Sequence, residues 1–348
     1  FITYSQPARL DAFSENLYYH EVGLKDYPLF QYAPYESALA SKMVDISKHH
    51  SIDVLHVHYA VPHAAAAYMA QNILKADGII VPFVTTLHGT DINLVGKDAT
   101  YAPVVTYSIN HSDGVTAVSE SLKKATYENF TITKDIEVIP NFIDYRRFSK
   151  TNKDHFKKAI APNGEKVLIH TSNFRKVKRV DDVLRIFHKV KQEIPAKLLL
   201  VGDGPERQHI EILARELCTG DEVRFLGKQD AVEEILSVSD LFLMPSGSES
   251  FGLAALEAMA CKVPVISSNV GGIPEINIQG KTGFLSDIGN VDEMAENALS
   301  ILRDESRLEE FKMNAFEKSK EFDVNSIVPK YESYYEHVIE QTKLLVGA

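Results

Sequence analysis

The chain has 348 residues, which at roughly 150 residues per domain indicates two domains, each able to bury its own core. Hydrophobic residues make up 45% and charged residues 24%, shares that exclude a disordered or fibrous protein. The net charge is −11, from 37 Lys and Arg against 48 Asp and Glu, and this balance disfavours nucleic acid and anionic membranes as partners.

Short β-rich runs alternate with helical stretches through the first half of the chain. The opening FITYSQ indicates a strand that runs into a loop, and we expect an earlier strand, turn and helix in a fold of this kind. Further strands are predicted at 53–59, 79–87, 114–118 and 136–139, with helices at 35–49 and 64–75. This alternation predicts βαβ units and a parallel sheet covered on both faces.

A polar break at 140–163 precedes a second half with the same pattern. Strands are predicted there at 166–171, 197–201, 223–226, 240–244 and 263–267, and helices at 181–192, 205–216, 252–261 and 324–345. We therefore predict an α/β protein with two Rossmann-like, doubly wound domains at 1–145 and 146–323, and a helical segment at 324–348 that packs back on the first. Ligands bind beyond the carboxyl ends of such strands, so two domains facing each other would enclose a central cleft.

The cysteines and the absence of targeting patterns indicate the cellular compartment of the protein. Cys218 and Cys261 fall in segments predicted to be helical and fit no CxxC motif, which favours free thiols and a reducing compartment. No apolar run approaches the roughly 18 residues of a membrane span, and no secretory signal opens the sequence. We expect a cytoplasmic protein without a membrane span.

The strongest motif is SGSESFGLAALEAMACKVPVISSNV at 246–270. A Gly/Ser-rich turn leads into a helix whose first free amides, around 251–253, form a ready anion site. Glu257 lies in an apolar run, where a carboxylate needs hydrogen-bond partners such as a ribose diol. A solvent-facing or capping glutamate is the alternative.

Two other segments carry candidate chemistry. SNFRKVKR at 172–179 places four cations within five residues after a predicted strand, which suits a diphosphate, with a solvated basic loop as the alternative. HVHYAVPH at 56–63 puts His56 and His58 on one face of a strand, so a metal site with His63 or His88 is one interpretation. Ordinary hydrogen bonds are the commoner use of histidines at strand ends.

The spacing of Glu249 and Glu257 in this context resembles the nucleotide-sugar site of retaining glycosyltransferases of family 4, which have the GT-B fold. The likeness continues through LVGDGPE, FLG, SD and GGIPE in the family's order and covers essentially the whole chain. It implies that Glu257 holds the ribose and that Glu249 lies beside the donor sugar. It further implies donor contacts from Asn173, Arg175, Arg179, Gly204, Ser250, Phe251, Gly252 and Leu253. Asn173 stands where the family usually has an arginine, which leaves Arg175 or Arg179 as its replacement.

The resemblance implies catalytic roles for His88, Lys178 and Glu249 and no required metal or other cofactor. Tyr59 matches an acceptor-side tyrosine of the family. The acceptor that the resemblance implies, L-malate, is a dicarboxylate and needs cations or hydrogen-bond donors. Arg9 is the only arginine before residue 146, so we expect it to anchor a carboxylate. A surface arginine is the alternative. Further candidates for the acceptor site are Lys42, Thr86 and Thr90.

Five segments, HYAVPHA, TTLHGTD, VIPNFID, HTSNFRKVKRV and ESFGLAALEAMA, resemble members that transfer N-acetylglucosamine from UDP-N-acetylglucosamine to the hydroxyl of L-malate, the first step of bacillithiol biosynthesis. The resemblance implies an enzyme that retains the α configuration and acts on these two small molecules, and it is compatible with a homo-oligomer. The alternatives are a family 4 transferase with another UDP-hexose or acceptor, an epimerase or hydrolase on the same fold, and a nucleotide-sugar-binding module without turnover.

Overall fold

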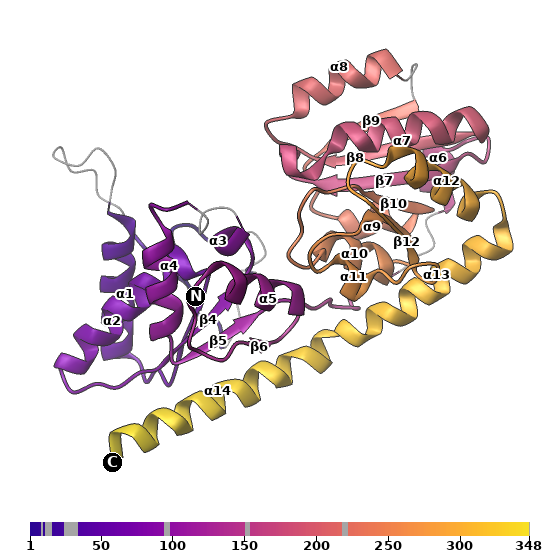
Figure 1. Cartoon of the computed structure of the whole chain (residues 1–348). Helices are drawn as coiled ribbons and strands as arrows, with labels where there is room; N and C mark the ends of the chain where they lie inside the picture. The colour runs from indigo at the N-terminus through magenta and orange to yellow at the C-terminus, as the bar shows by residue number, and fades with distance from the viewer. Residues whose placement is uncertain are drawn as a thin grey trace. The chain divides into compact units, whose positions relative to one another are not determined.

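The computed structural model describes residues 1–7, 10, 16–23, 34–93, 98–149, 154–217 and 222–347 (Figure 1). The chain forms two compact units, Phe1–Ile139 with Pro329–Ala348, and Pro140–Val328. The change from the first unit to the second therefore falls six residues before the predicted boundary after residue 145. The last helix contributes its residues from Pro329 onward to the first unit.

The described residues of the first unit form two parallel sheets. Four strands pair in the order β3 (Leu55–His58), β4 (Phe83–Leu87), β5 (Gly114–Ala117) and β6 (Glu137–Val138). A separate parallel pair is formed by β1 (Ile2–Thr3) and β2 (His20–Glu21). The helices are α1 (Tyr35–His49), α2 (Ala65–Ala76), α3 (Thr90–Asn93), α4 (Ala102–His111) and α5 (Glu120–Asn129), and a π-helical turn covers Ala60–Ala64. The ends of α1 are those that the sequence predicts.

Apolar spacing explains how α1 packs in this unit. Leu39, Ala40, Met43 and Ile46 recur at three- and four-residue intervals and are all buried, while the opposite side of the helix faces solvent. Figure 1 shows α1 and α2 side by side, and Leu74 and Phe83 complete the same core cluster. A cavity of about 630 Å³ is lined by residues of β1, β2, β3 and α1.

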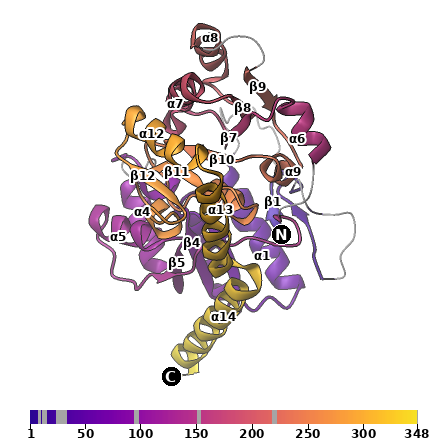
Figure 2. The same cartoon turned by 90° about the vertical axis from the view of Figure 1, so that its right-hand side faces the viewer.

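The second unit has one six-stranded parallel sheet. Its strands are β7 (Lys166–Ser172), β8 (Ala196–Gly202), β9 (Val223–Gly227), β10 (Leu241–Met244), β11 (Val265–Ser268) and β12 (Gly283–Ser286). Their order is β12, β11, β10, β7, β8, β9, and the labels follow one another from left to right in Figure 2. The order reverses between β7 and β10, which makes their carboxyl ends the switch point where ligands bind in such sheets.

Helices cover both faces of this sheet. The helices of the second unit are α6 (Asp154–Ile160), α7 (Val180–Glu193), α8 (Arg207–Leu217), α9 (Val232–Ser237), α10 (Leu253–Ala260), α11 (Ile273–Ile276), α12 (Val291–Leu302) and α13 (Glu305–Ser319). Side chains of α7, α8 and α12 share one core cluster with Leu168, Leu198 and Leu241 of the strands. Figure 1 shows α7 and α12 side by side. Because connections of parallel strands are right-handed, the reversal of strand order places α9 and α10 on the other face.

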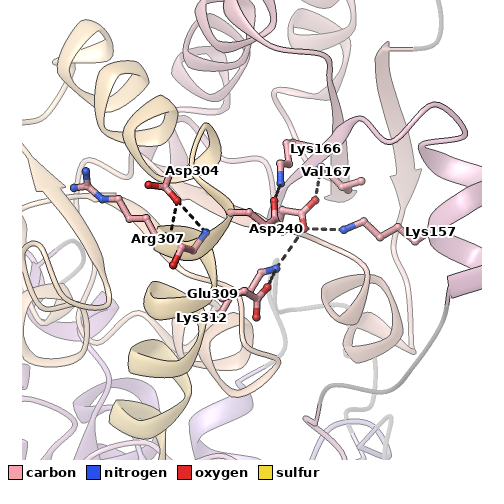
Figure 3. A network of polar contacts seen from close by, with 10 residues as sticks. Lys157, Lys166, Val167, Asp240, Asp304, Arg307, Glu309 and Lys312 are labelled. Carbon is pink, nitrogen blue, oxygen red and sulfur yellow. Dashed lines mark hydrogen bonds and ion pairs between the residues drawn. The ribbon is translucent and has the colours of Figure 1, made fainter.

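A buried carboxylate ties α6 and α13 to the amino ends of β7 and β10 (Figure 3). Asp240, 2% exposed, accepts a hydrogen bond from the Val167 amide at 2.9 Å and pairs with Lys157 Nζ at 2.7 Å. Lys312 Nζ lies 3.8 Å from the same carboxylate and 2.6 Å from Glu309. Removing one partner of a buried ion pair costs about 3–5 kcal/mol, so this network fixes the end of the sheet opposite the cavity described below.

The final helix, α14 (Val324–Gly347), begins in the second unit and is anchored in the first by tyrosines. The Tyr334 hydroxyl accepts from the Val115 amide at 2.9 Å and donates to the Val115 carbonyl at 3.1 Å. A Cβ at Gly114 would lie 2.7 Å from Val338 and 2.9 Å from Tyr334, so glycine is needed for this close approach.

Two further expectations concern cysteines and the membrane. Cys261 is buried and forms no disulfide among the described residues, and Cys218 lies outside them. Within the part of the chain that the structure describes, no helix is both long and apolar enough to cross a membrane.

Candidate active site

The second unit has a cavity of about 270 Å³ where β7 and β10 end. Its lining comes from the strand ends, the loop after β7 and the start of α10: His170, Thr171, Ser172, Asn173, Lys178, Met244, Ser246, Glu249, Leu253 and Ala254. The structure thus brings together Asn173, Lys178, Glu249 and Leu253, four of the predicted site residues. His170, Ser172 and Ser246 also line the cavity and were not predicted.

The loop after β7 is held against the turn after β8 by glycines. A Cβ at Gly204 would lie 1.9 Å from the Asn173 carbonyl oxygen, and one at Gly202 would lie 1.8 Å from that of Ser172. The Glu206 amide donates to the Phe174 carbonyl at 3.0 Å. Gly204 therefore acts through backbone packing, which sets the position of Asn173 at the cavity wall.

Lys178 and Glu249 form an ion pair inside the cavity. Lys178 Nζ lies 2.5 Å from Glu249 Oε1, and the Ser246 hydroxyl donates to the same oxygen at 2.9 Å. The side chains are 23% and 11% exposed, so both charges are shielded from most of the solvent. Such a pair places a positive group where a ligand phosphate can reach it, beside a carboxylate that orients it.

The start of α10 supplies backbone donors. Gly252 is its N-cap with φ +98, a conformation that disfavours side chains, and the amides of Leu253 and Ala254 have no partner within the helix. Phe251 is 2% exposed and its ring packs on Phe322 at 5.5 Å, so this residue offers a ligand its backbone alone.

Backbone packing also holds the turn at Ser250. Cβ atoms at Gly271 and Gly272 would lie 1.7 Å from the Glu249 carbonyl and 2.4 Å from that of Ser250. Glu257 is four residues beyond Leu253 and therefore lies on the same side of α10, and it is partly exposed. Glu249 and Glu257 therefore both lie near the amino-terminal end of α10.

The two arginines of the loop differ in their surroundings. Arg179 Nε donates to Asp182 Oδ2 at 2.6 Å, and this carboxylate is 4% exposed. Burial raises the pKa of Asp182, with the Arg179 hydrogen bond acting against it. Arg179 therefore holds a buried carboxylate, whereas the Arg175 side chain is open to solvent.

The first unit gathers histidines where β3 and β4 end. His58 Nδ1 lies 2.8 Å from His88 Nε2, and the Tyr59 and His88 rings are 5.1 Å apart. Asp91 fixes this arrangement because it accepts from the Ala60 amide at 2.9 Å and from the Gly89 amide at 3.0 Å. Burial raises the pKa of Asp91, against the effect of these amides. Tyr59 has φ +75, a strained value that these bonds support.

These histidines are neutral at ordinary pH. Burial, with His58 adding to it, lowers the pKa of His88 to about 4. Burial followed by His58 and His88 lowers the pKa of His56 to about 3. Among the described residues, no group of three or more His, Cys, Asp or Glu has the arrangement of a metal site. His56 instead uses both ring nitrogens on hydroxyls, Thr86 at 2.7 Å and Tyr335 at 2.6 Å.

The predicted acceptor residues are only partly brought together. Thr86 is fully buried and its hydroxyl also bonds Thr116 at 2.7 Å, which argues against direct acceptor contact and assigns it to the interior. Thr90 is exposed at the start of α3, two residues from His88. Lys42 lies midway along α1, and its Nζ is 3.9 Å from the Asp45 carboxylate. Arg9 lies outside the described residues.

The chain matches two family models over nearly its full length. Residues 1–147 match the one described as Glycosyltransferase Family 4, and residues 151–318 match Glycosyl transferases group 1. The N-acetyl-alpha-D-glucosaminyl L-malate synthase of Bacillus anthracis is 46% identical over 349 residues, covering 99% of this chain and 90% of that protein.

Solved structures share the architecture. HepE from Anabaena in complex with UDP and glucose has a TM-score of 0.78 at 22% identity, over 92% of this chain and 85% of that one. Sucrose-phosphate synthase from Thermosynechococcus elongatus has a TM-score of 0.75 at 21% identity, over 93% and 84% of the two chains. At these identities the similarity establishes the fold.

Proposed function

The chain belongs to glycosyltransferase family 4 and has the GT-B fold, and from this premise we propose that it transfers N-acetylglucosamine from UDP-N-acetylglucosamine to the hydroxyl of L-malate. The observation that carries the proposal is the 46% identity to the N-acetyl-alpha-D-glucosaminyl L-malate synthase of Bacillus anthracis over nearly the whole chain. The cavity with Lys178 and Glu249 supplies the chemistry that such a donor requires.

On the donor side, the barrier lies in separating a diphosphate from a cationic sugar. Lys178 and the free amides at the start of α10 stabilise the charge that develops on the β-phosphate, and Arg175 reaches the same group from the loop. Glu257 binds the ribose hydroxyls, and Glu249 orients Lys178 beside the sugar. These positive groups and dipoles perform the task without a metal in the proposed mechanism.

In the transfer step the bond from the anomeric carbon to the β-phosphate oxygen breaks and a bond to the malate hydroxyl oxygen forms on the same face. The hydroxyl proton passes to the departing phosphate, so the α configuration is retained and the products are UDP and a glycosyl malate. No carboxylate placed as a covalent nucleophile takes part.

In the first unit we assign His88 to contact with the donor sugar, and Tyr59 and Thr90 to contact with malate. The lowered pKa of His88 keeps its imidazole neutral, so it acts as a hydrogen-bond donor or acceptor and not as a cation. Arg9 and Lys42 remain candidates for the malate carboxylates. We place the activity in the cytoplasm, in line with the cysteine argument above.

A panel of donors and acceptors tests the assignment. Turnover is followed as UDP release with UDP-N-acetylglucosamine, UDP-glucose and UDP-galactose, each combined with L-malate, D-malate, lactate or inositol 3-phosphate. We expect turnover to be highest for UDP-N-acetylglucosamine with L-malate. A higher rate with another pair would assign the chain to a different member of the family, and release that ignores the acceptor would indicate a hydrolase or epimerase.

A further inference from the structure

We propose that His170 is a positioning residue for the diphosphate-binding loop, acting through Ser172 on the turn that presents Asn173 and Lys178 to the cavity. The inference rests on the proposed donor-binding function of this cavity. His170 and Ser172 line the cavity from the end of β7, and both are separate from the charged groups that would touch the donor.

Hydrogen bonds fix the protonation of the ring. His170 is 1% exposed, with Nδ1 at 2.8 Å from the Leu243 carbonyl and Nε2 at 2.8 Å from the Ser172 hydroxyl oxygen. A carbonyl only accepts, so Nδ1 carries the proton and Nε2 accepts from Ser172. The Ser172 oxygen then accepts from the Phe174 amide at 3.2 Å. One arrangement of protons satisfies every group in this chain of bonds.

The turn at Phe174 depends on such support. Phe174 has φ +38 and a fully buried side chain, and a side-chain-bearing residue in this left-handed region carries strain. The bond from Ser172 holds its amide, and the bond from Glu206 holds its carbonyl. Asn173 precedes Phe174, and Lys178 follows it by four residues. A shift of the backbone at Phe174 therefore moves both of these side chains at the cavity wall.

The neutral charge state of the His170 ring is compatible with its role in positioning the loop. Burial, opposed by the Leu243 hydrogen bond and aided by the nearby Lys178 ammonium, lowers the pKa of His170 to about 4. A neutral ring can accept from Ser172, whereas a protonated ring would present a second donor and add a positive charge beside Lys178.

The variants His170→Asn and Ser172→Ala distinguish a role in positioning the loop from a role in stabilising the fold. The amide nitrogen of His170→Asn lies near the place of Nδ1, so this variant keeps a donor for the Leu243 carbonyl and loses the acceptor for Ser172. Ser172→Ala removes the other side of the same bond. His188→Asn is the matched control, because His188 on α7 also bonds a carbonyl through Nδ1, that of Leu217 at 2.5 Å, and is absent from the cavity lining.

The experiment measures kcat, KM for UDP-N-acetylglucosamine, the Kd of UDP by calorimetry, and Tm. Loss of this positioning bond should lower kcat by about tenfold in His170→Asn and in Ser172→Ala, with the Kd of UDP changed by less than about threefold. The double variant should lose no more than either single one, because both break one interaction. His188→Asn should keep the wild-type kcat.

A second readout does not require turnover. The phosphorus NMR resonance of the β-phosphate in bound UDP should shift in both variants and stay in place in His188→Asn. The proposal is overturned if kcat and the resonance stay at wild-type values in Ser172→Ala, or if the two kcat losses multiply in the double variant. If His170→Asn does not fold, Ser172→Ala alone decides. Absence of UDP binding to the wild-type chain would instead refute the proposed function.

Discussion

Replacing Lys178 with alanine removes the positive group that the proposed mechanism places on the leaving diphosphate. Loss of one preorganised group that stabilises developing charge costs roughly 10²- to 10³-fold in kcat, about 2.7–4 kcal/mol. UDP also contacts the amides at the start of α10 in this account, so we expect its affinity to fall less than kcat does.

The same substitution has a smaller cost in stability. Lys178 and Glu249 are 23% and 11% exposed, so Glu249 loses its cation but keeps the Ser246 hydroxyl and access to some water. We expect a loss of about 1–2 kcal/mol, below the roughly 3–5 kcal/mol for a fully buried pair. For a unit of this size that lowers Tm by about 2–8 °C.

Steady-state UDP release, calorimetry with UDP and a thermal melt measure these three effects on one preparation. Lys189→Ala is the matched control because Lys189 forms an exposed pair with Asp292 at 2.8 Å, and all three quantities should keep their wild-type values. A cycle with Glu249→Gln measures the coupling of the pair. A kcat within about threefold of wild type in Lys178→Ala would refute the assigned role.

Three further predictions follow from the geometry. Glu257→Ala should weaken UDP binding by about tenfold or more, as expected for loss of hydrogen bonds from a carboxylate, and unchanged calorimetric affinity would exclude Glu257 from the ribose site. His88 and His170 have folded pKa values of about 4, so their contribution to stability is full above pH 6.5 and is lost as pH falls towards 4, by up to about 3 kcal/mol each. Urea midpoints that stay constant over this window would contradict it. Tyr335→Phe removes the hydroxyl at 2.6 Å from His56 Nδ1 and should cost about 1–2 kcal/mol in the free energy of unfolding while UDP affinity stays unchanged.

Local patterns were enough to predict much of the fold. The apolar spacing of α1 gave its bounds, and the alternation of strands and helices gave parallel sheets in two halves. The strand β12 and the helices α12 and α13 were not predicted. The short GFLS run of β12 shows little periodicity, and its pairing with β11 is a tertiary contact that the sequence does not reveal.

In the candidate site, too, the sequence allowed some residues to be predicted and not others. That Lys178, Glu249 and Leu253 meet at one cavity could be predicted because their loops carry charge or a helix start after a strand. His170 was missed because a buried histidine within a strand resembles a core residue, and its use depends on the neighbouring Leu243 carbonyl. The burial of Thr86 could not be predicted either, since its position on β4 does not reveal that His56 and Thr116 enclose its hydroxyl.

The most direct test of the proposed transfer is incubation with UDP-N-acetylglucosamine, with and without L-malate, while UDP release and the mass and anomeric configuration of the product are followed. We predict that UDP release requires malate and that each UDP is matched by one α-linked N-acetylglucosaminyl malate. UDP release at the same rate without malate, or a β-linked product, would contradict it.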